Sequence, residues 1–189
     1  MAFQSYRNRL LVASPSMKDP SFAETVVYLC EHTKSGAMGF VVNRPVHPEA
    51  VHAFSEMIFK QLDIPAKTVR LFEGGPVGLE NVFMLHRPVE PLTHSIALTG
   101  NVMLSTAKVD FEKIFRTKDP VDYVVVLGYC GWHRGQLEEE LSGTDWLVAP
   151  ADESLLFDEK PEGRYAKALA SIGINESDLA LWDTGSAKA

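Results

Sequence analysis

An uninterrupted run of apolar residues constrains the fold of this chain more than any other feature. Residues 123–127 read Tyr-Val-Val-Val-Leu, with no polar residue among the three valines. A strand with one face in water alternates apolar and polar residues, whereas a strand covered on both faces does not. We therefore predict that Tyr123 to Leu127 is a strand in the interior of a mixed sheet, with other elements packed on both sides.

Weaker signals along the rest of the chain predict further strands and helices. Leu10 to Ala13 reads as a strand, and Thr25 to Glu31 with Met38 to Asn43 reads as a hairpin, because β-branched and aromatic residues flank a short polar turn. Pro48 suits the first turn of a helix whose apolar residues recur at helical spacing as far as Leu62. Further strands are predicted at 69–72, 82–85, 95–98, 101–104 and 146–149, and further helices at 109–115, 136–141 and 164–172. The pattern predicts an α/β (α+β) fold with one domain over residues 1–182 and a flexible tail at 183–189.

The charge balance limits the class of partner. The chain has 18 Lys and Arg residues against 25 Asp and Glu residues, which gives a formal net charge of −7. Proteins that bind DNA neutralise its phosphates with clustered basic residues, and the basic residues here are scattered singly. The balance therefore argues against direct DNA binding, although a local basic patch could still form in the folded chain.

Cysteine usage and the length of the apolar stretches bear on the compartment. There are two cysteines, Cys30 and Cys130, which is fewer than a secreted chain of this size usually carries, and neither has the spacing of a metal site. The apolar stretches are shorter than a signal peptide or a membrane span requires. We expect a soluble cytoplasmic protein that has no membrane association, no metal and no cofactor.

The glycine-rich segment from Gly128 to Gly135 is predicted to be a loop between the central strand and a helix that begins near Gln136. Such a loop exposes backbone N–H groups that can hold an anion. The three glutamates at 138–140, however, compensate the helix dipole and would repel a phosphate. The favoured interpretation is a tight turn in which Trp132 packs on the core.

Several side chains in and after this segment could take part in chemistry or binding. Cys130 precedes His133 by three residues, and a thiolate beside a histidine at a helix start can be an activated nucleophile. The nearby glutamates disfavour an anionic sulfur, so an inert, partly buried cysteine is the favoured interpretation. Trp132 and Trp146 are expected to close one hydrophobic region, and Gln136 to satisfy a free N–H at the helix start, as a capping side chain does.

Polar residues at strand ends supply the remaining candidates. His32 and His86 could act in acid–base chemistry, but hydrogen bonding to a backbone group is the favoured role for each. Residues 43–44 end the second strand of the hairpin, and Arg44 is expected at the rim of any site, where it could hold a carboxylate or phosphate. The favoured alternative for Arg44 is an ion pair with a glutamate such as Glu73 or Glu138.

Taken together, these segments resemble the bacterial YqgE/AlgH family. The residues that carry the resemblance are 11–15, 19–20 with Phe22, 26–28, 31–32, 36–39, 43–45, 74–77, His86, 128–129, Trp132, 135–138, Glu140 and 146–147. The resemblance implies a compact α/β fold with a mixed, strongly curved sheet and helices packed around it. Members are often labelled transcriptional regulators because of an effect on alginate production, and the resemblance implies no catalytic residue.

Three functional hypotheses follow, in order of preference. The first is a non-enzymatic regulatory or adaptor protein that binds a protein or a small molecule. The second is a small enzyme whose cleft is formed by His32, Asn43, Arg44, His86 and the 128–135 loop, which would require these elements to converge in space. The third, which the charge balance makes weakest, is a regulator that binds DNA directly. The candidate binding surface consists of His32, Asn43, Arg44, His86, Trp132, His133, Arg134 and Gln136.

Overall fold

The computed structural model describes residues 3–65, 67–90, 92–119, 121–143, 145–175 and 178, so the predicted tail at 183–189 lies outside the described residues. The strands are β1 (Arg9–Ala13), β2 (Val26–Thr33), β3 (Gly36–Val41), β4 (Leu71–Glu73), β5 (Val77–His86), β6 (Ser95–Ala97), β7 (Met103–Ser105), β8 (Tyr123–His133) and β9 (Trp146–Pro150). The helices are α1 (Pro48–Leu62), α2 (Lys108–Arg116), α3 (Gln136–Ser142), α4 (Glu153–Phe157) and α5 (Pro161–Ala170).

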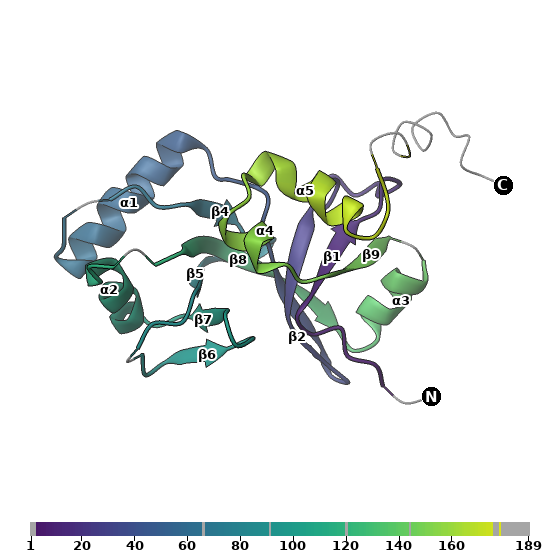
Figure 1. Cartoon of the computed structure of the whole chain (residues 1–189), viewed down its shortest axis with the longest axis horizontal. Helices are drawn as coiled ribbons and strands as arrows, with labels where there is room; N and C mark the ends of the chain where they lie inside the picture. Colours follow the sequence, from purple (N-terminus) through teal and green to yellow (C-terminus); the bar gives the residue numbers. More distant parts are fainter. Residues whose placement is uncertain are drawn as a thin grey trace.

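Within the described residues, the strands form one curled, nine-stranded sheet (Figure 1). Its order is β6-β7-β5-β8-β3-β2-β1-β9, and β4 pairs with β8 outside this path. The β4–β8 pair is parallel and the other pairs are antiparallel, so the sheet is mixed. The predicted fold class, a mixed and strongly curved sheet with packed helices, is confirmed.

β8 is the interior strand that the apolar run predicts. Its first half pairs with β5 and β4, and its second half pairs with β3. Val124 and Val126 belong to a core cluster with side chains of α4 and α5, whereas Val125 belongs to a cluster with side chains of α1 and α2. Both faces of the strand are therefore covered, which explains why the sequence shows no alternation.

The predicted loop at 128–135 is wrong, because β8 continues through Gly128 to His133. Gly128 allows neighbouring backbone to approach closely instead of making a turn. Gly128 has a φ of 68°, and a Cβ there would lie 2.6 Å from the carbonyl oxygen of Gly75. A Cβ on Gly75 would in turn lie 2.3 Å from the carbonyl carbon of Tyr129. The turn into α3 is thus confined to residues 134–135, and Trp132 lies on a strand.

The helices divide between the two ends and one face of the sheet (Figure 1). α1 and α2 lie at one end, near β4 and the start of β8, while α3 lies at the other end beside β9. α4 and α5 cover a face of the sheet between them. No helix in the described part of the chain combines the length and the apolar character that a membrane crossing needs.

A buried arginine attaches α4 and α5 to the sheet. The Arg164 side chain is fully buried and donates hydrogen bonds to the carbonyl oxygens of Val42, Leu156 and Glu159, the last two at 2.9 and 3.0 Å. Its guanidinium lies 5.0 Å from the centre of the Phe72 ring. Burial, with the neighbouring Arg70, lowers the pKa of Arg164 to about 10, so the side chain stays charged at neutral pH.

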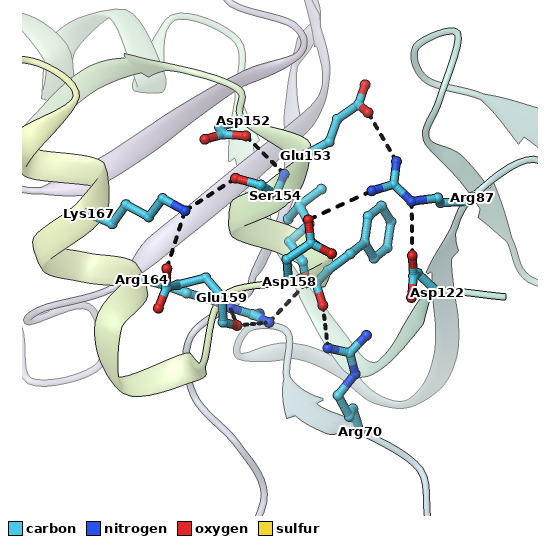
Figure 2. Close-up of polar contacts among 12 residues, drawn as sticks. Arg70, Arg87, Asp122, Asp152, Glu153, Ser154, Asp158, Glu159, Arg164 and Lys167 are labelled. Carbon is cyan, nitrogen blue, oxygen red and sulfur yellow. Dashed lines mark hydrogen bonds and ion pairs between the residues drawn. The ribbon is translucent and has the colours of Figure 1, made fainter. Parts of the chain in front are cut away.

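Charged side chains around this arginine complete what we call the α4–α5 clamp (Figure 2). Arg87 forms ion pairs with Asp122 at 3.0 Å, Glu153 at 3.3 Å and Asp158 at 4.0 Å. Further contacts are Arg70 to the Phe157 carbonyl at 2.7 Å, Lys167 to Glu159 at 3.2 Å, and the Ser154 N–H to Asp152 at 2.9 Å. The clamp therefore uses its charges to hold two short helices in place.

Candidate functional site

His32 is a structural residue between the N-terminal segment and α3. Its ring is buried; Nδ1 accepts the Tyr6 N–H at 2.9 Å, and Nε2 contacts Glu138 Oε1 at 3.2 Å. Phe3 and Tyr6 pack against the ring, with centroid distances of 5.0 and 5.7 Å. Both ring nitrogens are therefore engaged within the protein.

Asn43 and Arg44 hold the long loop that joins β1 to β2. The Asn43 amide accepts the Val26 N–H and donates to the Glu24 carbonyl, each at 2.8 Å. The Arg44 guanidinium donates to the carbonyl oxygens of residues 20, 21 and 23. Among the described residues Arg44 has no ion pair with Glu73 or Glu138, so the predicted ion pair is replaced by bonds to the loop.

His86 lies in a separate polar cluster under β6 and β7. Its side chain is buried, with Nδ1 donating to the Arg87 carbonyl at 2.7 Å and Nε2 at 2.8 Å from the Ser105 hydroxyl. Ser105 contacts Ser95, which contacts the buried Asp110 carboxylate at 3.1 Å. Burial lowers the pKa of His86, partly offset by its bond to Arg87 and by Asp110.

Trp132 and Gln136 meet at a carboxylate, that of Glu140, which the predicted binding surface did not include. Glu140 Oε2 accepts the indole N–H groups of Trp132 and Trp146, each at 2.8 Å, and Oε1 accepts the Gln136 amide at 2.9 Å. The two indoles belong to one core cluster, as predicted, and they lie edge to face with centroids 6.2 Å apart. Gln136 also accepts the His133 backbone N–H at 3.0 Å. His133 is the last residue of β8 and no described side chain caps α3, so the predicted capping role of Gln136 is wrong.

A cleft of about 770 Å³ lies in front of these residues. One wall is the loop from Ser16 to Phe22, and the other is formed by β8, α3 and the start of β9. Its lining includes Met17, Phe22, Trp132, Gln136, Glu140 and Trp146. A second hollow of about 440 Å³ is lined by Arg44, Glu73 and Leu79, among others, and the two share Pro76. We call the two hollows together the groove.

An irregular segment of β5 forms part of the rim. Val77 pairs with Tyr129 and Val82 pairs with Leu127, so residues 78–81 bulge out between them. Val77 and Leu79 are 40% and 61% exposed, and they line the first and second hollow respectively. A bulge of this kind re-aims side chains at the edge of a site. Here it presents two apolar side chains to solvent beside the groove.

The groove contains one thiol, and its environment makes the thiol inert. Burial raises the pKa of Cys130 to about 12, against smaller opposing effects of a backbone hydrogen bond and Arg44. Its sulfur lies 3.5 Å from the carbonyl oxygen of Gly74. A buried thiol of this kind is neither an effective nucleophile nor a metal ligand. Among the described residues, no group of three or more His, Cys, Asp or Glu side chains is arranged to hold a metal ion.

The structure thus brings together only part of the predicted surface. Trp132 and Gln136 line the first hollow and Arg44 lines the second, while His133 and Arg134 are exposed at the turn into α3. His32, Asn43 and His86 line neither hollow. The residues that sequence reasoning missed are Phe22, Val77, Leu79 and Glu140. Glu140 carried one usable signal, because it lies four residues after Gln136 and so on the same helix face.

Comparison with known proteins identifies the family of this chain. The AlgH-like family model matches residues 10–177. The chain belongs to the AlgH-like family. A UPF0301 protein of Cupriavidus metallidurans is 40% identical over 172 residues, covering 91% of this chain and 90% of that protein. A UPF0301 protein of Pseudoalteromonas translucida is 37% identical over 177 residues, covering 93% and 96%.

Solved structures agree with the family assignment. The solution structure of AlgH from Pseudomonas aeruginosa is 34% identical, with a TM-score of 0.75, and the match covers 100% of this chain and 98% of that one. A crystal structure of a Corynebacterium diphtheriae protein, 20% identical with a TM-score of 0.69, shares the fold over 89% of this chain and 88% of that one. The AlgH structure supports the family and the fold, whereas the Corynebacterium diphtheriae structure supports the fold alone.

Proposed function

We propose that the protein is a non-enzymatic, cytosolic adaptor that binds an extended segment of a protein partner in the groove. The observation that carries this proposal is the bulge at residues 78–81, which leaves Val77 and Leu79 exposed on the rim. Exposed apolar side chains beside a concave surface are typical of interaction sites. Their position along two adjoining hollows suits a chain that runs past both.

The shape of the groove favours a protein segment over a small molecule. Two hollows of about 770 and 440 Å³ adjoin at Pro76, so the surface is long and open. Small-molecule sites usually enclose most of the ligand in a single concave pocket. An extended segment can instead place successive side chains into neighbouring hollows and rest apolar groups on Leu79.

The chemistry of the lining supports a binding role rather than catalysis. The Cys130 thiol has a raised pKa, and the Glu140 carboxylate is engaged by two indoles and an amide. An enzyme would need a nucleophile or base that is free to reach a substrate. The enzyme hypothesis also needs His32 and His86 in the cleft, and each is engaged elsewhere.

Direct DNA binding is not part of the proposal. The net charge of −7 would oppose a duplex, and the first hollow carries Asp19, Glu140 and Asp145. We expect no tight binding of the purified protein to any promoter fragment at physiological salt. Steeply salt-dependent, sub-micromolar binding in a gel-shift titration would restore the regulator hypothesis.

A display experiment tests the proposed function. The purified protein is used to select from a random dodecapeptide library, and selected peptides are mapped by NMR on the labelled protein. We expect selected peptides to shift amide signals of residues that line the groove, and Leu79→Asp to abolish their binding. Ile96→Asp is the matched control, because Ile96 is 58% exposed on β6 and lines neither hollow. Peptides that bind Leu79→Asp and wild type equally, or the absence of any selected peptide, would contradict the proposal.

A further inference from the structure

The Glu140 carboxylate is held by three neutral donors. The indole N–H groups of Trp132 and Trp146 reach one oxygen, and the amide of Gln136 reaches the other. Neutral donors fix the position of a carboxylate and leave its charge uncompensated. Among the described residues, no Lys, Arg or His forms an ion pair with Glu140. A negative charge is thus placed, in fixed orientation, in the wall of a cleft.

Other partly buried glutamates of the chain differ from Glu140 in this respect. Glu138 contacts His32, Glu153 and Glu159 pair with Arg87 and Lys167, and Glu112 pairs with Arg116. A charge that leaves water is normally compensated by an opposite charge, because its desolvation is unfavourable. Among the partly buried glutamates that the structure describes, Glu140 is therefore the one without an ion pair.

We propose that Glu140 is the recognition point for a basic side chain, lysine or arginine, of the bound partner segment. The inference rests on the proposed function and deepens it by naming the kind of side chain that the first hollow binds. One further lone pair on Oε1 remains free for a donor from the partner. A basic side chain in the cleft would supply the ion pair that Glu140 does not form with the described residues of the protein itself.

The surroundings of Glu140 suit such a side chain. The first hollow carries three carboxylates, on Asp19, Glu140 and Asp145, against one ammonium group on Lys18. The ring of Phe22 lies edge to face with Trp146, at a centroid distance of 5.5 Å. Lysine and arginine pack their alkyl stems along apolar surface of this kind while the charged head reaches a carboxylate, and aromatic rings attract a cation.

The test compares charged and neutral forms of one probe on the wild-type protein. The probes are Nα-acetyl-lysine methylamide and Nα-acetyl-arginine methylamide, with the Nε-acetyl-lysine and citrulline analogues as neutral counterparts. The indole N–H signals of Trp132 and Trp146 report on Glu140 directly, because both groups donate to it. We expect the two basic probes to shift both signals saturably and the neutral probes to leave them unchanged.

A variant pair provides the second arm. Glu140→Gln keeps an oxygen for the indole bonds and removes the charge, and we expect it to weaken binding of the basic probes about tenfold or more. Glu139→Gln, an exposed neighbour outside the cleft, should bind them within about twofold of wild type. If Glu140→Gln does not fold, the comparison of charged and neutral probes on wild type still decides the matter.

The outcomes separate this inference from the proposed function. If selected peptides occupy the groove but lysine, arginine and their neutral analogues behave alike, the adaptor proposal stands and the role of Glu140 is refuted. If the basic probes shift the indole signals while no selected peptide binds, the charge site stands and the adaptor proposal fails. Equal binding of the basic probes to wild type and a folded Glu140→Gln variant also overturns the inference.

Discussion

The α4–α5 clamp and the groove differ in whether their charged side chains have partners within the protein. In the clamp, Arg87 and Lys167 have carboxylate partners (Figure 2). Arg164 donates to three carbonyl oxygens. In the groove, Glu140 has only neutral donors. The clamp uses its polar groups to hold the fold together. The groove holds a carboxylate without an opposite charge, and we propose that a partner supplies that charge.

This comparison predicts that the largest loss of stability comes from the clamp. Arg164→Met removes the donor of two buried carbonyl oxygens, of Val42 and Leu156, and of the partly buried one of Glu159. Each unpaired buried acceptor costs about 1–3 kcal/mol, so we expect a loss of roughly 2–6 kcal/mol. Chemical denaturation monitored by circular dichroism measures the change. The control is Lys167→Met, on the same helix and exposed, which should cost under about 1 kcal/mol. An Arg164→Met variant as stable as wild type would show that the clamp does not hold α4 and α5.

The next effect tests whether the aromatic wall of the groove belongs to the core. Trp146 and Trp132 are 3% and 7% exposed, and replacing either with alanine should cost about 3–5 kcal/mol. Trp146→Phe should recover most of this loss, because the ring is retained while the indole bond to Glu140 is lost. If either alanine variant melts like wild type but loses peptide binding, the tryptophan is a binding platform and not a core residue.

A smaller effect is expected at the charge in the groove. Glu140→Gln should lower the stability by only about 1 kcal/mol, because the indole bonds remain and one bond to Gln136 is disturbed. Thermal unfolding of this variant beside Glu139→Gln measures the difference. A loss as large as that of Arg164→Met would mean that the negative charge is a structural requirement, and the contrast between the two regions would fail.

The smallest effect is expected at the outer edge of the clamp. Arg87 is 35% exposed, and its bond to Asp122 is the main cause of its raised pKa, with burial opposing and nearby carboxylates adding to it. Ion pairs with this exposure are screened by solvent, so Arg87→Gln should cost less than about 1 kcal/mol and less still at high salt. Denaturation midpoints at low and high salt test this, and a salt-independent loss would point to the contact of Arg87 with the Phe157 ring instead.

The sequence predicted the fold correctly where the local pattern of apolar residues matches their burial in the structure. The run 123–127 has both faces covered, so its uniform apolar character is visible in the sequence and identifies the interior strand. Residues 128–133 were misread because Gly128 serves close contacts with Gly74 and Gly75, far away in the chain. α4 has five residues, too short to show a helical repeat, and Arg164 reads as a surface residue although it is fully buried.

The candidate site was predictable only in part, for the same reason. Trp132 and Gln136 belong to one continuous segment, so attention to that segment found both. The bond that joins Trp132 and Trp146 through Glu140 depends on β8, α3 and β9 meeting in space. The exposure of Leu79 depends on a pairing irregularity between β5 and β8. Neither feature has a local signature.

The central claim is that the groove, and not the clamp, meets the partner. The most direct measurement is NMR of the labelled protein during titration with a peptide from the display selection, following the two indole N–H signals and the clamp amides of residues 153–157 together. The account predicts saturable shifts of the Trp132 and Trp146 indole signals and no change at 153–157. Shifts at 153–157 with unmoved indole signals would contradict it.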